Sequence, residues 1–217
     1  MRSRAALYAL ADGRMAAGGF TPSYGFEAAG ITDLRGLRMH LLGRLYGSLR
    51  ADRAIATETC RLGPPGWDRL AWEADVRAAN MSQRELARSR GQMLLRFGRR
   101  IFTDAGVMLP DELPEPVAIG AISWFAQANP EEADALTLYT GIAGPMWTAV
   151  RILSLDPTDA AGLIVDLCAA APPPAPAGHI PAATSPLGDV LNELNARRSV
   201  RGGGMNGRNG MGPPGHF

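Results

Sequence analysis

The spacing of apolar residues along the chain predicts helices almost throughout. In residues 32–50 leucines recur every three or four positions, which places them on one face of an amphipathic helix: Leu34, Leu37, Leu41, Leu45 and Leu49. Thr32 or Asp33 is the expected N-cap of this helix, and residues 51–61 continue the same pattern. The sequence "LGPPG" at 62–66 then ends it, because two prolines and a glycine cannot continue a helix.

Residues 67–102 return to a helical pattern that contains a second helix start. The sequence "SQRE" at 82–85 matches a capping box, which predicts Ser82 as an N-cap. The apolar stripe of the helix that follows is predicted to consist of Leu86, Met93, Leu94, Phe97 and Ile101.

The second half of the chain is also predicted to be helical. After Pro116, "VAIGAISWFAQA" is typical of a helix buried on most sides. "NPEE" at 129–132 predicts a helix start with Asn129 as N-cap and Pro130 at the first position. Pro145, together with two glycines nearby, predicts a kink or break near the middle of this helix. "DPTD" at 156–159 caps one more helix, which extends to about Ala171.

These patterns predict an all-α fold with three parts. Residues 1–171 form a packed, irregular helical bundle, since the chain has no repeat of fixed period and no sustained heptad. Residues 172–186 form a Pro-rich linker, and residues 187–217 form a short helix followed by a disordered, Gly-rich tail. The fold is therefore expected to be a bundle with a flexible C-terminal tail rich in Pro and Gly.

Composition narrows the classes of partner. With 22 basic and 21 acidic residues the net charge is +1, which argues against nucleic acid and an anionic membrane. All the basic residues are arginines, whose planar guanidinium groups suit carboxylates and backbone carbonyls. No stretch reaches the roughly 20 apolar residues of a membrane span, and the first residues do not match a secretory signal. The chain is therefore expected to be cytoplasmic.

Few residues point to chemistry. Cys60 and Cys168 are expected to be small buried hydrophobes rather than a disulfide, and the histidines lack partners at metal-ligand spacing. The sequence therefore predicts no metal site and no tightly bound cofactor. Motifs of hydrolases and nucleotide-binding proteins do not occur. An enzyme remains an alternative only if Asp12 and Glu27 converge in a pocket with Arg14 or Arg151.

Arginines recur along the helix predicted after residue 82. Arg84, Arg88, Arg96 and Arg100 are spaced at multiples of four and share one helix face, here called the arginine ridge. Two interpretations are equally supported: a solvated face, and a docking edge for an acidic partner. A nucleic-acid-binding surface ranks third, because no aromatic residues lie between the arginines.

Three segments resemble the UreF family of urease accessory proteins. "ADGRMAAGGFTPSYGFEAA" at 11–29 is similar to the family's N-terminal motif, with Pro22 standing where the family usually has His. "RELARSRGQMLLR" at 84–96 resembles the second motif, while "PEPVAIGAI" and "AVRILSLDP" resemble the third region. The matching residues are Asp12, Arg14, Gly18, Gly19, Phe20, Ser23, Gly25, Glu27, Arg84, Arg88, Ser89, Gly91, Gly120 and Arg151.

The resemblance implies an all-α scaffold that is not an enzyme. Proteins of this family bind the accessory protein UreD (also called UreH) and recruit the GTPase UreG, so that nickel reaches apo-urease. They tend to form dimers. The motif residues, together with Arg96, are then expected to contact partners, and nickel to be at most a transient ligand. Arg197 and Arg198 are the nearest candidates for the C-terminal arginine that helps to seat the family's partner. The enzyme that uses Asp12 and Glu27 and the nucleic-acid-binding module stay as alternatives.

Overall fold

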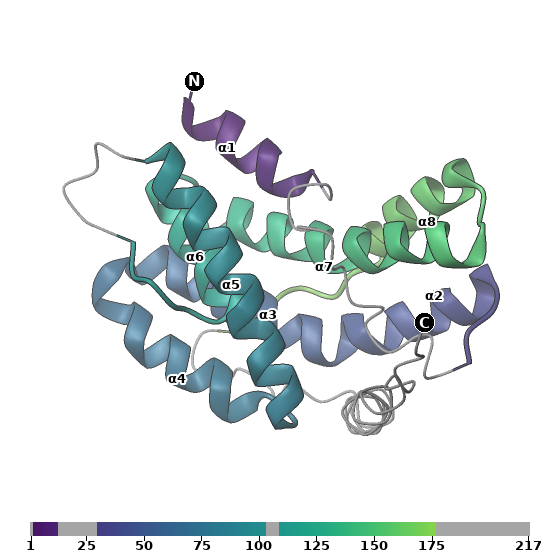
Figure 1. Ribbon diagram of the computed structural model, residues 1–217, viewed down its shortest axis with the longest axis horizontal. Helices are drawn as coiled ribbons and strands as arrows, with labels where there is room; N and C mark the ends of the chain where they lie inside the picture. Colours follow the sequence, from purple (N-terminus) through teal and green to yellow (C-terminus); the bar gives the residue numbers. More distant parts are fainter. Residues whose placement is uncertain (1, 13–29, 103–108, 177–217) are drawn as a thin grey trace, which may run out of the picture.

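The structure, a computed structural model, describes residues 2–12, 30–102 and 109–176. Within these residues the chain forms helices and no β-strand, which confirms the all-α prediction (Figure 1). No helix in this part is long and apolar enough to cross a membrane. The elements are α1 (Arg2–Ala11), α2 (Leu34–Tyr46), α3 (Ser48–Leu62), the 3₁₀ turn η1 (Pro64–Gly66), α4 (Trp67–Arg77), α5 (Met81–Ile101), α6 (Glu115–Phe125), α7 (Pro130–Leu153) and α8 (Pro157–Ala169).

Helix α6 is the most buried element and packs against α3 and α5. Every position from Pro116 to Ser123 is buried, as the apolar sequence of this segment predicts. The small residues among them, including Gly120, let neighbouring helices approach from more than one side. The prediction of a helix buried on most sides is confirmed.

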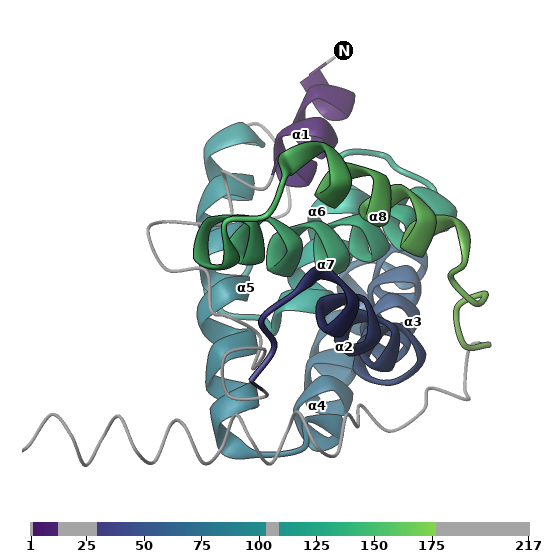
Figure 2. The same cartoon turned by 90° about the vertical axis from the view of Figure 1, so that its right-hand side faces the viewer.

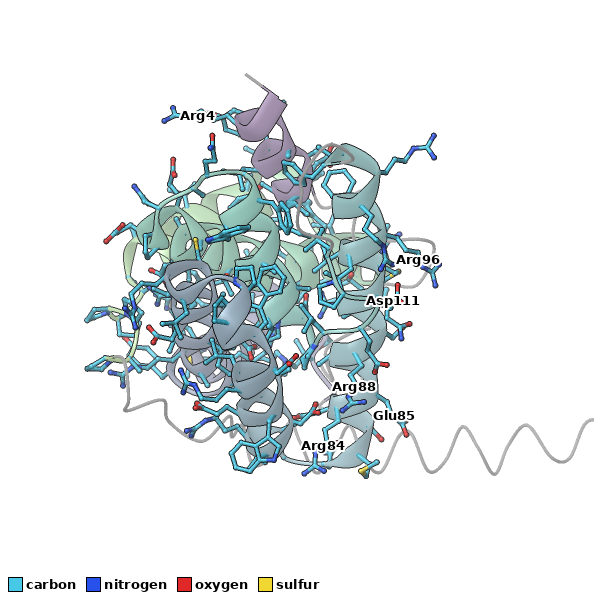
Figure 3. The ribbon with its side chains drawn as sticks, turned by 90° about the vertical axis from the view of Figure 1, so that its left-hand side faces the viewer. Arg4, Arg84, Glu85, Arg88, Arg96 and Asp111 are labelled. Atoms are coloured by element: carbon cyan, nitrogen blue, oxygen red, sulfur yellow. The ribbon has the colours of Figure 1, made fainter. Side chains whose placement is uncertain are left out.

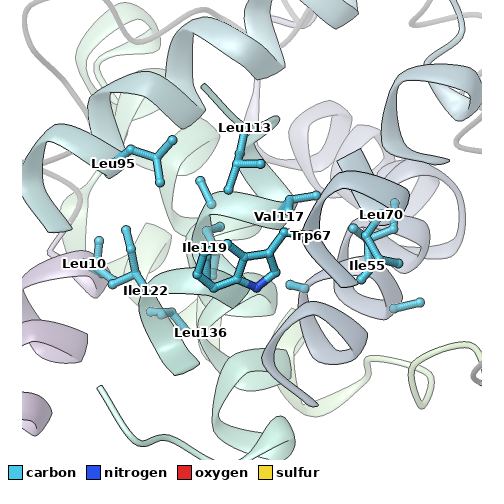
Figure 4. Close-up of a cluster of buried hydrophobic side chains, with 14 of the residues drawn as sticks. Leu10, Ile55, Trp67, Leu70, Leu95, Leu113, Val117, Ile119, Ile122 and Leu136 are labelled. Atoms are coloured by element: carbon cyan, nitrogen blue, oxygen red, sulfur yellow. The ribbon is translucent and has the colours of Figure 1, made fainter. Parts of the chain in front are cut away.

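Two clusters of buried side chains form the core. The first gathers α1, α3, α4, α5 and α6 around residues such as Trp67 and Ile122 (Figure 4). The second joins α2, α7 and α8 around Leu41 and Met146. In Figure 1 the helices of the first cluster lie to the left and α2 and α8 lie to the right. Helices α3 and α7 contribute residues to both clusters and therefore tie them together.

The first predicted amphipathic segment folds as two helices. Leu37, Leu41, Leu45 and Leu49 are all buried, which confirms the stripe. The chain turns at Gly47, however, where φ is −107° and ψ is −110°, so that Leu49 belongs to α3. Leucine spacing alone does not distinguish one long helix from two helices with a turn between them.

Polar caps fix the helix starts. Asp33 accepts a hydrogen bond from the Gly36 N–H (2.7 Å), and Asn129 accepts one from the Glu132 N–H (2.7 Å), so both are N-caps as predicted. Glu132 in turn accepts a hydrogen bond from the Asn129 N–H (3.0 Å), which completes a capping box. The start predicted at Ser82 is wrong. Asn80 accepts a hydrogen bond from the Gln83 N–H (2.9 Å), so α5 begins at Met81.

The apolar stripe predicted for α5 needs correction. Leu94 and Phe97 of the predicted stripe pack against the first cluster, but the fully buried positions are Gly91, Leu95 and Gly98, and Leu86 is 36% exposed. The prediction followed the large apolar residues. Helix α5 instead turns two glycines toward neighbouring segments, because a close helix contact requires small residues there.

Helix α7 runs unbroken from Pro130 to Leu153, so the predicted kink or break near Pro145 is not a break. Proline has no N–H to donate to the Gly141 carbonyl one turn earlier. The Arg44 guanidinium of α2 donates to that oxygen instead, at 3.0 Å. A side chain distant in sequence thus satisfies the group that the proline leaves without its helical partner.

Residues directly after α8 pack against the helical body. Arg53 of α3 is buried and donates to both carboxylate oxygens of Asp134 on α7, each at 2.7 Å. Its third contact is the Pro172 carbonyl oxygen, at 2.6 Å. Ala175 is also buried and belongs to the first cluster. Arg53 therefore joins α3, α7 and the start of the segment that follows α8.

Candidate functional site

The first motif lies mostly outside the described residues. Asp12 directly follows α1, and its backbone N–H donates to the Tyr8 carbonyl at 3.0 Å. The other residues of this motif fall in the segment 13–29, which the structure does not describe: Arg14, Gly18, Gly19, Phe20, Ser23, Gly25 and Glu27. Their proposed roles, including the acid pair of Asp12 and Glu27, stay predictions.

In the second motif, Gly91 is a packing residue. A Cβ atom at this position would lie 1.8 Å from the Leu113 carbonyl oxygen and 3.0 Å from the Pro114 carbonyl carbon. Real Cβ contacts do not occur at such distances. Glycine at this point therefore lets α5 lie directly against the segment that enters α6. The neighbouring Ser89 is exposed.

The third region supplies a second close contact on α6. A Cβ atom at Gly120 would lie 2.4 Å from the Ala56 carbonyl oxygen of α3. Arg151, in contrast, is exposed near the end of α7. Two glycines from separate motifs thus serve close packing at α6: Gly91 of α5 against the segment that enters α6, and Gly120 of α6 against α3. The structure places Arg151 on the surface.

The arginine ridge follows the outer face of α5 (Figure 3). Its first half is engaged within the molecule. Arg88 forms ion pairs with Asp75 of α4 and with Glu112, whose Oε1 lies 3.0 Å from the arginine Nη1. Arg84 is half-buried, and its guanidinium lies 3.9 Å from the Met81 sulfur. Arg88 therefore fixes α5 to α4 and to the segment before α6, while the printed contact of Arg84 stays within α5.

The second half of the ridge faces solvent. Arg96 and Arg100 are exposed, and neither forms an ion pair or hydrogen bond within the part of the chain that the structure describes. Between them, Arg99 pairs with Asp111 at 2.6 Å. A separation of four residues on one helix places the two free guanidinium groups side by side. Two cations are therefore available on this face for carboxylates of another molecule.

A polar cleft lies where five helices meet, and sequence reasoning missed it. Its charged residues come from four of these helices, and the cleft, which opens to solvent, is small, with a volume of about 20 Å³. These residues, here called the four-charge cluster, are Arg44 of α2, Asp52 of α3, Arg90 of α5 and Glu115 of α6. Helix α7 adds uncharged groups, among them Thr137 and Thr140.

The two carboxylates of the four-charge cluster differ in their partners. Glu115 accepts the Arg90 guanidinium at 3.0 Å and lies in the first turn of α6, where the helix dipole favours negative charge. No hydrogen bond from the described residues reaches the Asp52 carboxylate. Burial and the negative charge of Glu115 raise the pKa of Asp52 to about 7, although Arg44 opposes this shift.

The sequence does contain a signal for this cleft. Asp52 lies three residues after Leu49 and three before Ile55, so the helical period places this acid on the buried face of α3. An acidic residue in that position indicates either a buried ion pair or a functional group.

The remaining candidates for metal or thiol chemistry lie apart. No group of three or more His, Cys, Asp or Glu residues within the described ranges could hold a metal ion. Burial, with a smaller effect of Arg44, lowers the pKa of His40 to about 4. Cys60 and Cys168 are both free thiols, and burial raises the pKa of Cys60 to about 11. A raised pKa makes a thiol less reactive at neutral pH.

Comparison with known proteins gives one consistent family. A family model described as UreF matches residues 31–168, which is more than half of the chain. A urease accessory protein UreF of Mycobacterium marinum is 33% identical over 208 residues, covering 91% of this chain and 97% of the relative. One of Mycobacterium tuberculosis (strain H37Rv) is 34% identical over 169 residues, covering 73% and 77%. No solved structure matches the chain.

Proposed function

The chain belongs to the UreF family of urease accessory proteins, and from this premise we propose that it is the scaffold that binds UreD (UreH) and recruits UreG. It has a role in urease maturation and is an accessory protein rather than an enzyme. In the proposed complex, UreG supplies GTP hydrolysis and nickel passes to apo-urease. Nickel is a transient ligand, not a resident cofactor of this chain.

The observation that carries the proposal is the similarity along 91% of the chain, together with the family-model match over residues 31–168, which contain the second motif and the third region. The structure adds a physical reason why a scaffold suits this sequence. Gly91 and Gly120 allow α6 to pack closely between α5 and α3. Close packing restricts the relative movement of these helices, so surfaces on them keep a fixed geometry for partners.

We propose that the partner contacts include the first-motif residues and the free half of the arginine ridge. Arg96 and Arg100 present two guanidinium groups without a partner among the described residues, on a rigid helix, which fits paired carboxylates on a partner. Arg88 differs, because Asp75 and Glu112 already hold its guanidinium.

The remaining expectations complete the proposal. The helical body of residues 1–171 forms the scaffold. Residues 172–186 are proposed as a linker whose first part, with Pro172 and Ala175, packs against the body, and residues 187–217 as a short helix and flexible tail. Two copies of the chain form a dimer within the complex. The complex assembles in the cytoplasm, without nucleic acid or membrane.

The first experiment is co-purification of the tagged full chain with UreD and UreG from the same source. Size-exclusion chromatography with light scattering then gives the mass of the complex. A mass that contains both partners and two copies of this chain supports the proposal. If the chain elutes alone although both partners are folded and present, the proposed assembly is wrong.

Charge reversal then tests the surface. The double substitution Arg96→Glu/Arg100→Glu should reduce capture of at least one partner without loss of helicity. The matched control is Arg35→Glu/Arg38→Glu, since both arginines are exposed on α2 and the change in net charge is the same. Equal capture by the two variants would exclude the free half of the ridge as a contact.

A further inference from the structure

The segment that follows α8 consists almost entirely of proline. The sequence of residues 171–176 is "APPPAP", so four of the six residues have no N–H group and a φ angle fixed by the ring. Each residue that precedes a proline is also restricted to extended conformations. Such a sequence favours polyproline II, which has three residues per turn and no internal hydrogen bonds. Its backbone carbonyls are therefore available to donors elsewhere in the chain.

Burial along this segment repeats every three residues. Pro173 and Pro176 are exposed, whereas Ala175 is buried and belongs to the first cluster. Pro172, three positions before Ala175, presents its carbonyl oxygen to the helical body. A period of three places Pro172 and Ala175 on one side of an extended segment and the two exposed prolines on another. The segment therefore contacts the body with one side and faces solvent with the other.

The buried guanidinium of Arg53 holds this segment, which passes beside α3 in Figure 1. Its Nη1 donates to the Pro172 carbonyl at 2.6 Å, while Nε and Nη2 donate to the two carboxylate oxygens of Asp134 at 2.7 Å each. Arg53 is only 3% exposed, so its donors need partners inside the protein. The proline carbonyl satisfies the nitrogen that Asp134 does not reach.

The contacts that hold the segment differ from those that hold the helices. No backbone hydrogen bond of the described residues joins residues 172–176 to another element. When the segment leaves, Arg53 keeps its ion pair with Asp134, so the buried charge stays paired. A unit that is held by few contacts opens more often than the helices on which it lies. Release of the segment therefore does not require unfolding of the body.

We propose that residues 172–176 are a releasable strap, which docks on the body through Arg53 and Ala175 and leaves it without unfolding of the helices. The docking site takes an extended, proline-rich segment that offers a carbonyl to Arg53 and a small side chain three positions later. The docked strap fixes the point from which residues 177–217 continue. The site belongs to the single chain and does not depend on the proposed partners.

The first test measures nitrogen-15 relaxation of the Ala175 amide in the full chain. An order parameter of about 0.85, typical of rigid backbone, is expected, and one below about 0.6 would overturn docking of the strap. Arg53→Met/Asp134→Leu removes the donor without leaving a buried charge unpaired. In this variant the order parameter of Ala175 should fall below about 0.6, while the amides of α3 and α7 keep theirs.

The matched control is Arg61→Met/Glu58→Leu, which removes another bidentate ion pair, one that lies within α3. Ala175 should stay as ordered in this variant as in the wild type. If Ala175 stays ordered in both double variants, Arg53 does not hold the strap and the proposal is wrong. It fails equally if α3 and α7 lose order together with Ala175, because the strap is then not a separate unit.

Thiol labelling followed by mass spectrometry measures release in a full chain that carries Cys168→Ala. Ala175→Cys places a thiol on the docked side of the strap, Pro173→Cys places one on the exposed side, and the buried Cys60 reports on the body. Protection is the labelling rate in urea divided by the rate in native buffer. It should be near one at position 173, about tenfold or more at position 175, and at least about tenfold higher again at Cys60.

Either of two labelling results would refute the strap. Equal protection at position 175 and at Cys60 would mean that the segment leaves only when the whole chain unfolds. Equal protection at positions 175 and 173, together with a low order parameter for Ala175 in the wild type, would mean that the segment does not dock.

Discussion

Replacement of Gly91 by alanine tests whether this motif residue serves packing. The added Cβ would lie 1.8 Å from the Leu113 carbonyl oxygen, whereas ordinary contacts begin at 3.4 Å. Removing the overlap requires α5 and the segment before α6 to separate by about 1.6 Å. The added Cβ would clash with a backbone oxygen, so no flexible side chain can move aside to relieve the overlap. The separation would also loosen the packing of Leu95 and Gly98, which lie on the same face of α5.

Two opposing effects set the magnitude. Forcing extra atoms into a packed core costs about 1–3 kcal/mol and occasionally more. Replacing glycine by alanine inside a helix contributes up to about 1 kcal/mol in the opposite direction. Because the contact is with backbone, the upper part of the first range applies. We expect a net loss of about 2 kcal/mol, which lowers the melting temperature by about 4–8 °C for a chain of this size.

Gly43→Ala is the matched control. Gly43 lies in α2, is exposed, and has no heavy atom within 4 Å of the position of an added Cβ. This substitution should raise the melting temperature by about 2–4 °C through helix propensity alone. Thermal melts followed by circular dichroism measure both variants. If Gly91→Ala is as stable as Gly43→Ala, the close approach of α5 to Leu113 does not exist and the reasoning fails.

Three other substitutions or modifications test separate features. Asp134→Ala leaves the buried Arg53 guanidinium without its bidentate partner and should reduce the free energy of unfolding by about 3 kcal/mol, measured by urea denaturation. The double substitution Arg53→Met/Asp134→Leu removes both charges and should reduce the free energy of unfolding by less. Asn129→Ala removes the side chain that caps α7 and should cost about 1 kcal/mol in the same assay, and no loss would contradict the capping box. Cys60 and Cys168, whose thiol pKa values burial raises, should react with a thiol reagent at pH 7.5 more slowly in the folded chain than in urea; equal rates would contradict their burial.

Local features of the fold could be predicted because their causes are local. Asp33 and Asn129 cap helices through hydrogen bonds to N–H groups three residues away, and the stripe from Leu37 to Leu49 follows the helical period. The two errors at helix ends and interiors have equally specific causes. Asn80, not Ser82, is the N-cap of α5. Arg44, distant in sequence, donates to the Gly141 carbonyl, to which Pro145 has no N–H to donate.

The candidate site could be predicted only in part. The arginine ridge could be predicted from the spacing of arginines on one helix. Its division into a paired half and a half that faces solvent could not, because the acids that pair with Arg88 lie 13 and 24 residues away. Leu86 was expected to be buried, yet α5 turns Gly91 and Gly98 to the core. Periodicity shows that a helix has an apolar face, while the shape of its neighbours decides which residues that face contains.

The sequence by itself determined the helical class, most helix boundaries and the family, since each depends on residues close together in the chain or on matching motifs. Only the tertiary structure decided that Asp52 and Glu115 share one cleft, that Arg44 completes α7, and that Gly91 admits the Leu113 carbonyl. These contacts join residues far apart in sequence. The packing of the helices decides which residues meet in these contacts. The sequence of one helix does not show which residues the neighbouring helices place against it.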